Sequence, residues 1–210
     1  TDLTAVGTLT VDGVVSGATS DLTTAAAATS FGATTVGQDL SVTASGTVSD
    51  TAKLAVTGTT AISAPGQTVE LDTATNDFTG AVTVTGGATT LKDANDLTVT
   101  LTTSGATDLT AVDTLTVDGT VSGATSDLTT AAAATSFGAT TVGQDLSVTA
   151  SGTVSDTAKL AVAGATTISA TGQTVELDTA TNDFTGAVTV TGGATTLKAA
   201  NDLTVSVTTS

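Results

Sequence analysis

Aspartate is the residue type in this sequence that is best suited to chemistry. It recurs before an apolar residue, mostly about 19 residues apart, in the pairs Asp2-Leu3, Asp21-Leu22, Asp39-Leu40, Asp77-Phe78 and Asp96-Leu97. Carboxylate oxygens are ligands for hard cations such as Ca²⁺. The loops fit a calcium site poorly, because Leu97 stands where an EF-hand loop needs an oxygen ligand.

A structural role for these residues competes with calcium binding, because Asp and Asn side chains can satisfy backbone N–H groups at corners. If a metal binds, the candidate ligands are Asp77, Asp96, Asp183 and Asp202. No other cofactor is expected. A structural ladder of side chains that hydrogen-bond between successive turns is expected at Asn76, Asn95, Asn182 and Asn201.

The composition argues against an enzyme. The chain has no His, Cys or Tyr, and its four basic residues are all Lys, so the usual bases, nucleophile–base pairs and guanidinium clamps cannot form. Two carboxylates could hydrolyse a glycoside, but the aromatic platforms of a sugar cleft are missing, since Phe is the only aromatic type. We predict that the protein is not an enzyme.

Threonine offers a different kind of surface. The T-x-T spacing at Thr8/Thr10, Thr83/Thr85 and Thr98/Thr100/Thr102 could align hydroxyl and methyl groups on a flat strand face, as in ice-binding solenoids. Such a face needs the motif on successive turns, and its spacing along the sequence is irregular. The alternative is that β-branched Thr is simply the usual exposed residue of a strand.

The charge limits the partners. A net charge of -16 disfavours binding to nucleic acid, which needs clustered cations, and to anionic membrane surfaces. The sequence contains no charged-then-apolar leader and no long apolar stretch, so neither a signal peptide nor membrane insertion is expected.

The chain consists of two copies of one unit, residues 1–106 and 107–210, which we expect to form one continuous solenoid. The copies align at an offset of 106 residues. They differ at Gly7/Asp113, Val14/Thr120, Thr57/Ala163, Thr59/Ala165, Ala61/Thr167, Pro65/Thr171, Asp93/Ala199, Thr100/Ser206 and Leu101/Val207. These exchanges are mostly small or polar, as expected for exposed or corner positions. Asp93 is a poor candidate for an essential ligand, because Ala199 replaces it.

A shorter period of about 19 residues within each unit predicts the fold. Apolar residues alternate with Thr, as in Val82 to Thr85, and Gly or Asx residues stand between the alternating segments. A segment of this size must stack on its neighbours to bury an apolar face. The prediction is an all-β, right-handed parallel β-helix (solenoid) of roughly 10–12 turns without helices. The alternative is two tandem immunoglobulin-like β-sandwiches, because the unit has the size of such a domain.

Expected strands of the first unit are Thr8–Val11, Ala33–Val36, Leu40–Thr43, Lys53–Val56, Thr59–Ile62, Thr68–Leu71, Gly80–Val84, Ala88–Leu91 and Leu97–Leu101. Apolar residues of these strands, together with the four Phe residues, are expected inside.

The segment N-D-F-T-G-A-V-T-V-T-G-G-A-T-T-L-K-D-A-N-D-L-T-V-T, residues 76–100, resembles the repeat regions of filamentous-haemagglutinin-like adhesins and other giant bacterial surface proteins. The resemblance also covers the copy at residues 182–206. It implies a parallel β-helix exported across the outer membrane and used as a shaft, adhesin or surface filament. Shaft repeats have no defined binding site, so no site residue is carried over.

The predicted function is therefore a structural shaft of a secreted bacterial surface adhesin or filament, located extracellularly and extending or connecting at the cell surface. Expected partners are further copies of itself, joined covalently or head to tail, and lateral self-association is a further option. The alternative function is a calcium-dependent or ice-binding adhesion module.

Overall fold

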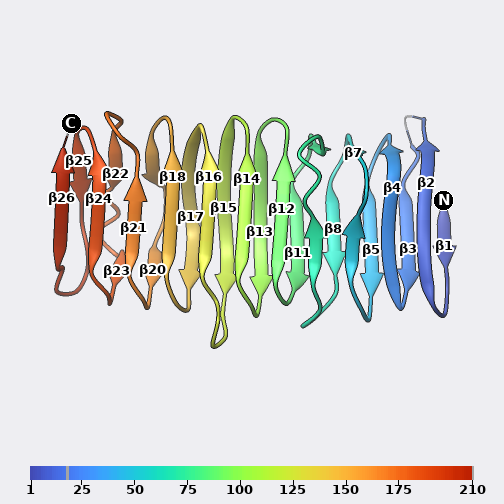
Figure 1. Cartoon of the computed structure of the whole chain (residues 1–210), viewed down its shortest axis with the longest axis horizontal. Helices are drawn as coiled ribbons and strands as arrows, with labels where there is room; N and C mark the ends of the chain where they lie inside the picture. The colour runs from blue at the N-terminus through green and yellow to red at the C-terminus, as the bar shows by residue number, and fades with distance from the viewer. Residues whose placement is uncertain (18, 210) are drawn as a thin grey trace.

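Two long parallel sheets make up the fold (Figure 1). The computed structural model describes residues 1–17 and 19–209. Sheet A contains β1 (Asp2–Thr4), β3 (Leu22–Ala26), β5 (Leu40–Ala44), β8 (Thr60–Ser63), β11 (Val82–Gly86), β13 (Leu97–Thr103), β15 (Thr114–Val121), β17 (Ala134–Val142), β19 (Val154–Asp156), β20 (Leu160–Val162), β22 (Val175–Leu177), β23 (Asp183–Phe184) and β25 (Thr195–Leu197).

Sheet B faces it and contains β2 (Thr8–Val15), β4 (Ala28–Val36), β6 (Val48–Asp50), β7 (Leu54–Val56), β9 (Val69–Leu71), β10 (Asp77–Phe78), β12 (Thr89–Asp93), β14 (Thr107–Ala111), β16 (Leu128–Ala132), β18 (Leu146–Ala150), β21 (Thr166–Ser169), β24 (Val188–Gly192) and β26 (Val205–Thr209).

The chain crosses from one sheet to the other and back in each turn, which builds a parallel β-solenoid of about ten turns. The described residues contain no helix, and so none that could cross a membrane. The predicted parallel β-helix and its number of turns are confirmed. Two immunoglobulin-like sandwiches are excluded, because their sheets are antiparallel, whereas β13 pairs in parallel with β15 across the boundary between the two units.

Alternation of side chains along each strand forms the core. In β11, Val82 and Val84 are fully buried while Thr83 between them is exposed. The parallel register then stacks apolar residues on apolar residues, since Val82 pairs with Val99 and Val84 with Leu101 on the next turn. Burying each such side chain contributes about 1.5–3 kcal/mol, so a turn is stabilised by its neighbours above and below.

The interior is narrow and continuous. Its largest side chains are the four phenylalanines, which are all buried as predicted, and the rest is mainly Val, Leu, Ile and Ala. Threonine also enters it, for example at Thr24 and Thr60. Small β-branched residues fill a thin cross-section that has no room for many aromatic rings.

The expected strands are present with boundary shifts, and four further strands of the first unit lie outside the expected ranges. These are β1, β3, β6 and β10. All four are short or lack alternation of large apolar residues with Thr, and β3 includes part of the Ala25–Ala28 run. Parallel pairing to neighbouring turns supplies the hydrogen bonds that these weak sequences need.

A unit contains about five and a half turns rather than a whole number. From β1, the chain passes through β2, β3, β4, β5, β6/β7, β8, β9/β10, β11, β12 and β13 to reach β14, the copy of β1, in eleven half-turns. One turn therefore takes about 19 residues, which explains the short period of the sequence.

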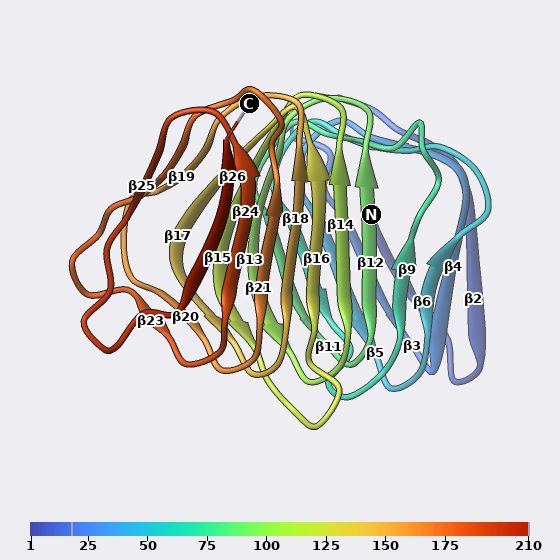
Figure 2. The same ribbon diagram turned by 60° about the vertical axis from the view of Figure 1, so that its left-hand side comes forward.

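The half-turn places equivalent strands of the two units in opposite sheets. Strand β2 lies in sheet B, whereas its copy β15 lies in sheet A and runs in the opposite direction in Figure 1. Figure 2, turned towards the C-terminal end, shows the successive turns nested behind one another. The same surface of each unit thus faces opposite sides of the rod.

Candidate functional site at the acidic corners

Aspartates at the corners between the sheets bond to the turn that follows them. Asp39 Oδ1 accepts a hydrogen bond from the Thr59 backbone N–H at 2.6 Å, and Asp96 Oδ1 accepts one from Thr114 N–H at 2.8 Å. In the second unit, Asp145 Oδ1 bonds to the N–H of Ala165 at 2.7 Å. Carboxylate oxygens that could ligate a cation are here used to join successive turns.

Two of the candidate metal ligands share one depression. Asp77 and Asp96 line a hollow of about 220 Å³ together with Asn95, Phe78 and Thr79. Asp77 Oδ2 lies 3.2 Å from Lys53 Nζ, and Asp77 Oδ1 accepts a hydrogen bond from Asn95 Nδ2 at 3.3 Å. Both oxygens of Asp77 therefore already have partners within the protein.

The copies in the second unit repeat part of this arrangement. Asp183 Oδ2 lies 3.5 Å from Lys159 Nζ, and Asp183 Oδ1 accepts a hydrogen bond from Asn201 Nδ2 at 2.9 Å. Asp202 is exposed beside Asn201. Within residues 1–17 and 19–209, no group of three acidic, His or Cys side chains is close enough to hold a metal ion.

The four asparagines fall into two different pairs. Asn76 and Asn182 are fully buried, and their Oδ1 atoms accept hydrogen bonds from the backbone N–H groups of Leu54 and Leu160, each at 2.8 Å. Asn95 and its copy are exposed and donate to the corner aspartates described above. All four bond between turns, but the partners are carboxylates and backbone groups rather than other asparagines.

Asp50 and its copy Asp156 were not singled out from the sequence. Asp50 is largely buried, and its carboxylate accepts hydrogen bonds from Asn76 Nδ2 and from the backbone N–H groups of Asp72 and Thr73. Asp156 repeats the contact with Asn182. Asp50 lies outside the 19-residue pattern of Asp–apolar pairs, so no sequence signal marked it.

Among the positions that differ between the two units, Asp93 is the one at which a charged residue is buried. It is only 2% exposed, and its carboxylate accepts hydrogen bonds from the backbone N–H groups of Phe78 and Asn95, both at 2.7 Å. Burial raises the pKa of Asp93 and the charges of Asp77 and Asp96 add to this, while the two backbone hydrogen bonds oppose it. The expectation that differing positions are mostly exposed or at corners is wrong for this residue and for Leu101, which lies in the core.

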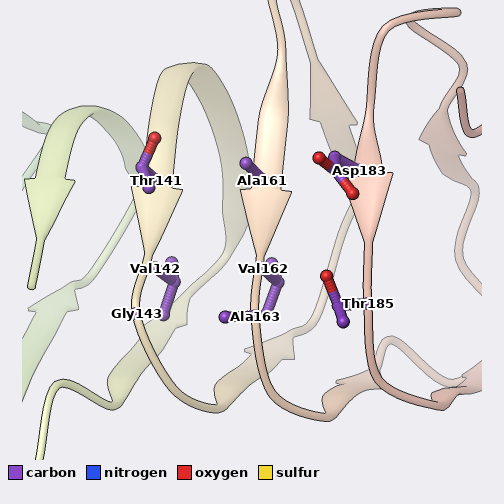
Figure 3. A pocket seen from close by; sticks show the side chains of 8 residues that line it. All are labelled: Thr141, Val142, Gly143, Ala161, Val162, Ala163, Asp183 and Thr185. Atoms are coloured by element: carbon purple, nitrogen blue, oxygen red, sulfur yellow. The ribbon is translucent and has the colours of Figure 1, made fainter. Parts of the chain in front are cut away.

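A second depression, of about 160 Å³, lies on sheet A of the second unit (Figure 3). Thr141, Ala161 and Asp183 form one row across the paired strands β17, β20 and β23. The hollow arises because the side chains are small, and it offers one carboxylate that Lys159 already pairs. This arrangement has no nucleophile–base pair.

Outward-facing threonines and serines align in two ranks on one face of each unit. In the first unit this ladder face lies on sheet A and consists of Thr23, Ala25, Ser41, Thr43, Ala61, Ser63, Thr83, Thr85, Thr100 and Thr102, two from each successive strand. In the second unit it lies on sheet B and consists of Thr129, Ala131, Ser147, Thr149, Thr167, Ser169, Thr189, Thr191, Ser206 and Thr208.

The T-x-T motif itself recurs irregularly, as expected, because in the first unit only β11 and β13 carry Thr at both ladder positions and the other strands carry Ser or Ala at one or both. Corner loops differ in length, but parallel pairing brings the hydroxyl residues of successive turns into register. Serine and alanine at motif positions hid the pattern from a search for threonine alone.

The stacked parallel sheets and the aspartate corners define a tandem-repeat β-solenoid. The chain belongs to the family described as repeats of unknown function (DUF5649), whose model matches residues 17–85 and 125–191, more than half of the chain. The two matched segments fall one in each unit. No curated protein and no solved structure matches the chain.

Proposed function

We propose that this chain is a segment of a rigid shaft in a bacterial surface adhesin or filament, which extends or connects at the cell surface. The observation that carries the proposal is the junction between the two units. Strand β13 pairs with β15 over seven residues, from Leu97–Leu115 to Thr103–Val121, and β12 pairs with β14 on the other sheet. The core and both sheets run through the boundary without a hinge.

The same junction suggests how further copies would join. A unit ends in strands that pair directly with the first strands of the next unit, so additional units, joined covalently or head to tail, would dock by the same backbone hydrogen bonds. The role is mechanical and extracellular, as the resemblance of residues 76–100 to bacterial surface repeats implies. Catalysis has no place in this proposal, and the corner carboxylates serve the stacking of turns.

Rigidity can be measured directly, because the chain contains no cysteine and two introduced cysteines would carry the only spin labels. Thr4 and Thr141 occupy one rank of sheet A, separated by seven strand spacings. At about 4.8 Å per spacing, a rigid shaft predicts a narrow distance distribution near 34 Å. Thr4 and Thr85, within one unit and four spacings apart, form the control pair with about 19 Å.

A narrow control distance with a broad distribution for Thr4 and Thr141 would place a flexible hinge at the junction and contradict a shaft. The cellular test inserts the chain between a surface anchor and a reporter domain. Each unit is expected to raise the reporter by about 26 Å, from five and a half strand spacings. If the reporter height is unchanged by adding a unit, the spacer function fails.

A further inference from the structure

The ladder faces are uncharged areas on a strongly acidic molecule. The net charge is -16, yet the ten residues of each ladder face are Thr, Ser or Ala. Asp2 and Asp118 on sheet A and Asp108 on sheet B pair with the outermost strands of these faces, and the corner aspartates Asp21, Asp39, Asp127 and Asp145 lie just before the ladder strands, at the edge of each face. The charge is therefore kept off the flat centre of each face.

Both repeats of the ladder are fixed by the backbone. Residues two apart on a strand lie about 6.6–6.8 Å apart, and neighbouring strands lie about 4.8 Å apart. Thr83 thus stands between Ala61 and Thr100 on the adjacent turns, with Thr85 beside it in the second rank. The result is a two-dimensional array in which six of the ten positions of each face are Thr, whose β-branched side chains have few rotamers. Ser and Ala at the other four positions supply a hydroxyl or a methyl group alone.

The chemistry of the array limits the classes of partner that could bind to it. A crystalline polysaccharide is usually held by aromatic side chains, but all four Phe residues are buried. A mineral surface or a phosphate polymer needs charged groups, which the ladder faces lack. A second copy of the chain is disfavoured by area, because five strands present a face of only about 400 Å², half of the roughly 800 Å² per partner of a stable dimer.

We propose that the two ladder faces bind ice, an uncharged lattice of water molecules. Hydroxyl groups at regular intervals hydrogen-bond to the lattice, while the methyl groups between them sit against it with little bound water to displace. The half-turn between the units puts one ice-binding face on each side of the rod. This proposal is independent of the shaft function, since a chain that does not bind ice could still act as a shaft.

The test is partition of the 210-residue chain into a slowly growing ice hemisphere, together with inhibition of ice recrystallisation. Wild-type protein is expected to be enriched in the ice and to keep crystals small. Thr83→Lys combined with Thr189→Lys places a long charged side chain in the centre of each face, and both residues are exposed. The ice fraction should then contain no more of this double variant than of a protein that ice excludes.

The matched control is Thr35→Lys with Thr196→Lys, which adds the same charge at exposed positions on the sheet opposite the ladder face of each unit. It should partition as wild type, and thermal melts of both variants check that they are folded. Each single variant, Thr83→Lys or Thr189→Lys, should retain part of the activity through the other face.

Exclusion of wild-type protein from ice would overturn the proposal, and so would a folded double variant that partitions as wild type. Retention on crystalline cellulose, or dimerisation that the double variant abolishes, in a protein that ice excludes would assign the faces to those partners instead.

Discussion

Buried amide and carboxylate groups stabilise one corner of each unit, where Asn76 bonds to Asp50 and Asn182 bonds to Asp156. Asn76 connects three places in the chain, because its Oδ1 accepts from Leu54 N–H and its Nδ2 donates to Asp50. Asp50 in turn accepts from the backbone that follows β9. The pair is enclosed by the solenoid, so loss of one member leaves polar groups buried without partners.

We expect Asn76→Ala to lower the free energy of unfolding by about 2–4 kcal/mol, since it leaves the buried Leu54 N–H without an acceptor and removes one of the donors to the Asp50 carboxylate. Chemical denaturation followed by circular dichroism measures this loss. Asn95→Ala is the control, because Asn95 is exposed and donates one long hydrogen bond of 3.3 Å. An equal effect of the two substitutions would show that burial of the amide does not matter.

Asp93 makes stability depend on pH with a defined sign. Because burial raises its pKa in the folded state above the unfolded value of 3.8, the folded chain holds this proton more tightly. The stability it contributes is fully present below pH 3.8 and is lost as the pH rises through the raised folded pKa. Protonated Asp93 therefore suits the fold better than the ionised form.

The comparison is between wild type and Asp93→Ala, the residue present in the second unit at Ala199. The difference in unfolding free energy should shift in favour of wild type as the pH is lowered from neutrality, and other titrations cancel in the difference. A shift in favour of the variant on acidification would reverse the assigned sign.

Close contact between turns explains why one corner lacks its aspartate. The Asp–apolar marker is missing near Gly58, and there Asp39 of the preceding turn reaches across to bond to Thr59 N–H. Gly80 lies on the next turn, where a Cβ atom would overlap the carbonyl group of Gly58. The corner is closed by backbone against backbone, so only glycine fits at this point.

Gly80→Ala should therefore force adjacent turns apart and destabilise the protein by about 1–3 kcal/mol. Thermal melts compare it with Gly7→Ala, where nothing lies within 4 Å of the added Cβ and the second unit has Asp113. The control should change stability by about 0.5 kcal/mol or less. A harmless Gly80→Ala would mean that the corner has more room than its geometry indicates.

Five and a half turns per unit give the rod two equivalent sides. A whole number of turns would align the ladder faces of all units along one side, whereas the half-turn alternates them between sheets A and B. Any partner that recognises one unit would then meet the shaft on opposite sides in successive units. The true repeat of an array of such units would be two units.

Gold labels attached to cysteines at Thr83 and at its copy Thr189 test this arrangement. Electron images should show the two labels on opposite sides of the rod, displaced by about 26 Å along its axis. The pair Thr83 and Thr120, both exposed on sheet A, is the control and should label one side. If Thr83 and Thr189 label the same side, the unit contains a whole number of turns.

Pairing between neighbouring turns, whose residues are far apart in the sequence, decided what local patterns left open. Residues such as Val82, Thr83 and Val84 reveal their strand and their burial by alternation alone, because a strand places successive side chains on opposite faces. Strands such as Val48–Asp50 carry no such pattern, and they form because β4 and β9 present backbone groups to them on both sides. The buried role of Asp50 and Asp93 was equally hidden, since it depends on which turn covers them.

The sequence by itself determined the unit of 106 residues, the period of about 19 residues and the all-β class, because periodicity and side-chain alternation are local properties that the chain carries along its length. It favoured a solenoid, but parallel pairing in the structure was needed to exclude two sandwiches. Only the tertiary structure decided the register between turns. That register aligns the ladder faces, pairs the corner aspartates with backbone N–H groups and sets the half-turn between units. These features depend on corner lengths summed over a whole unit, and a difference of one half-turn moves every surface to the opposite side.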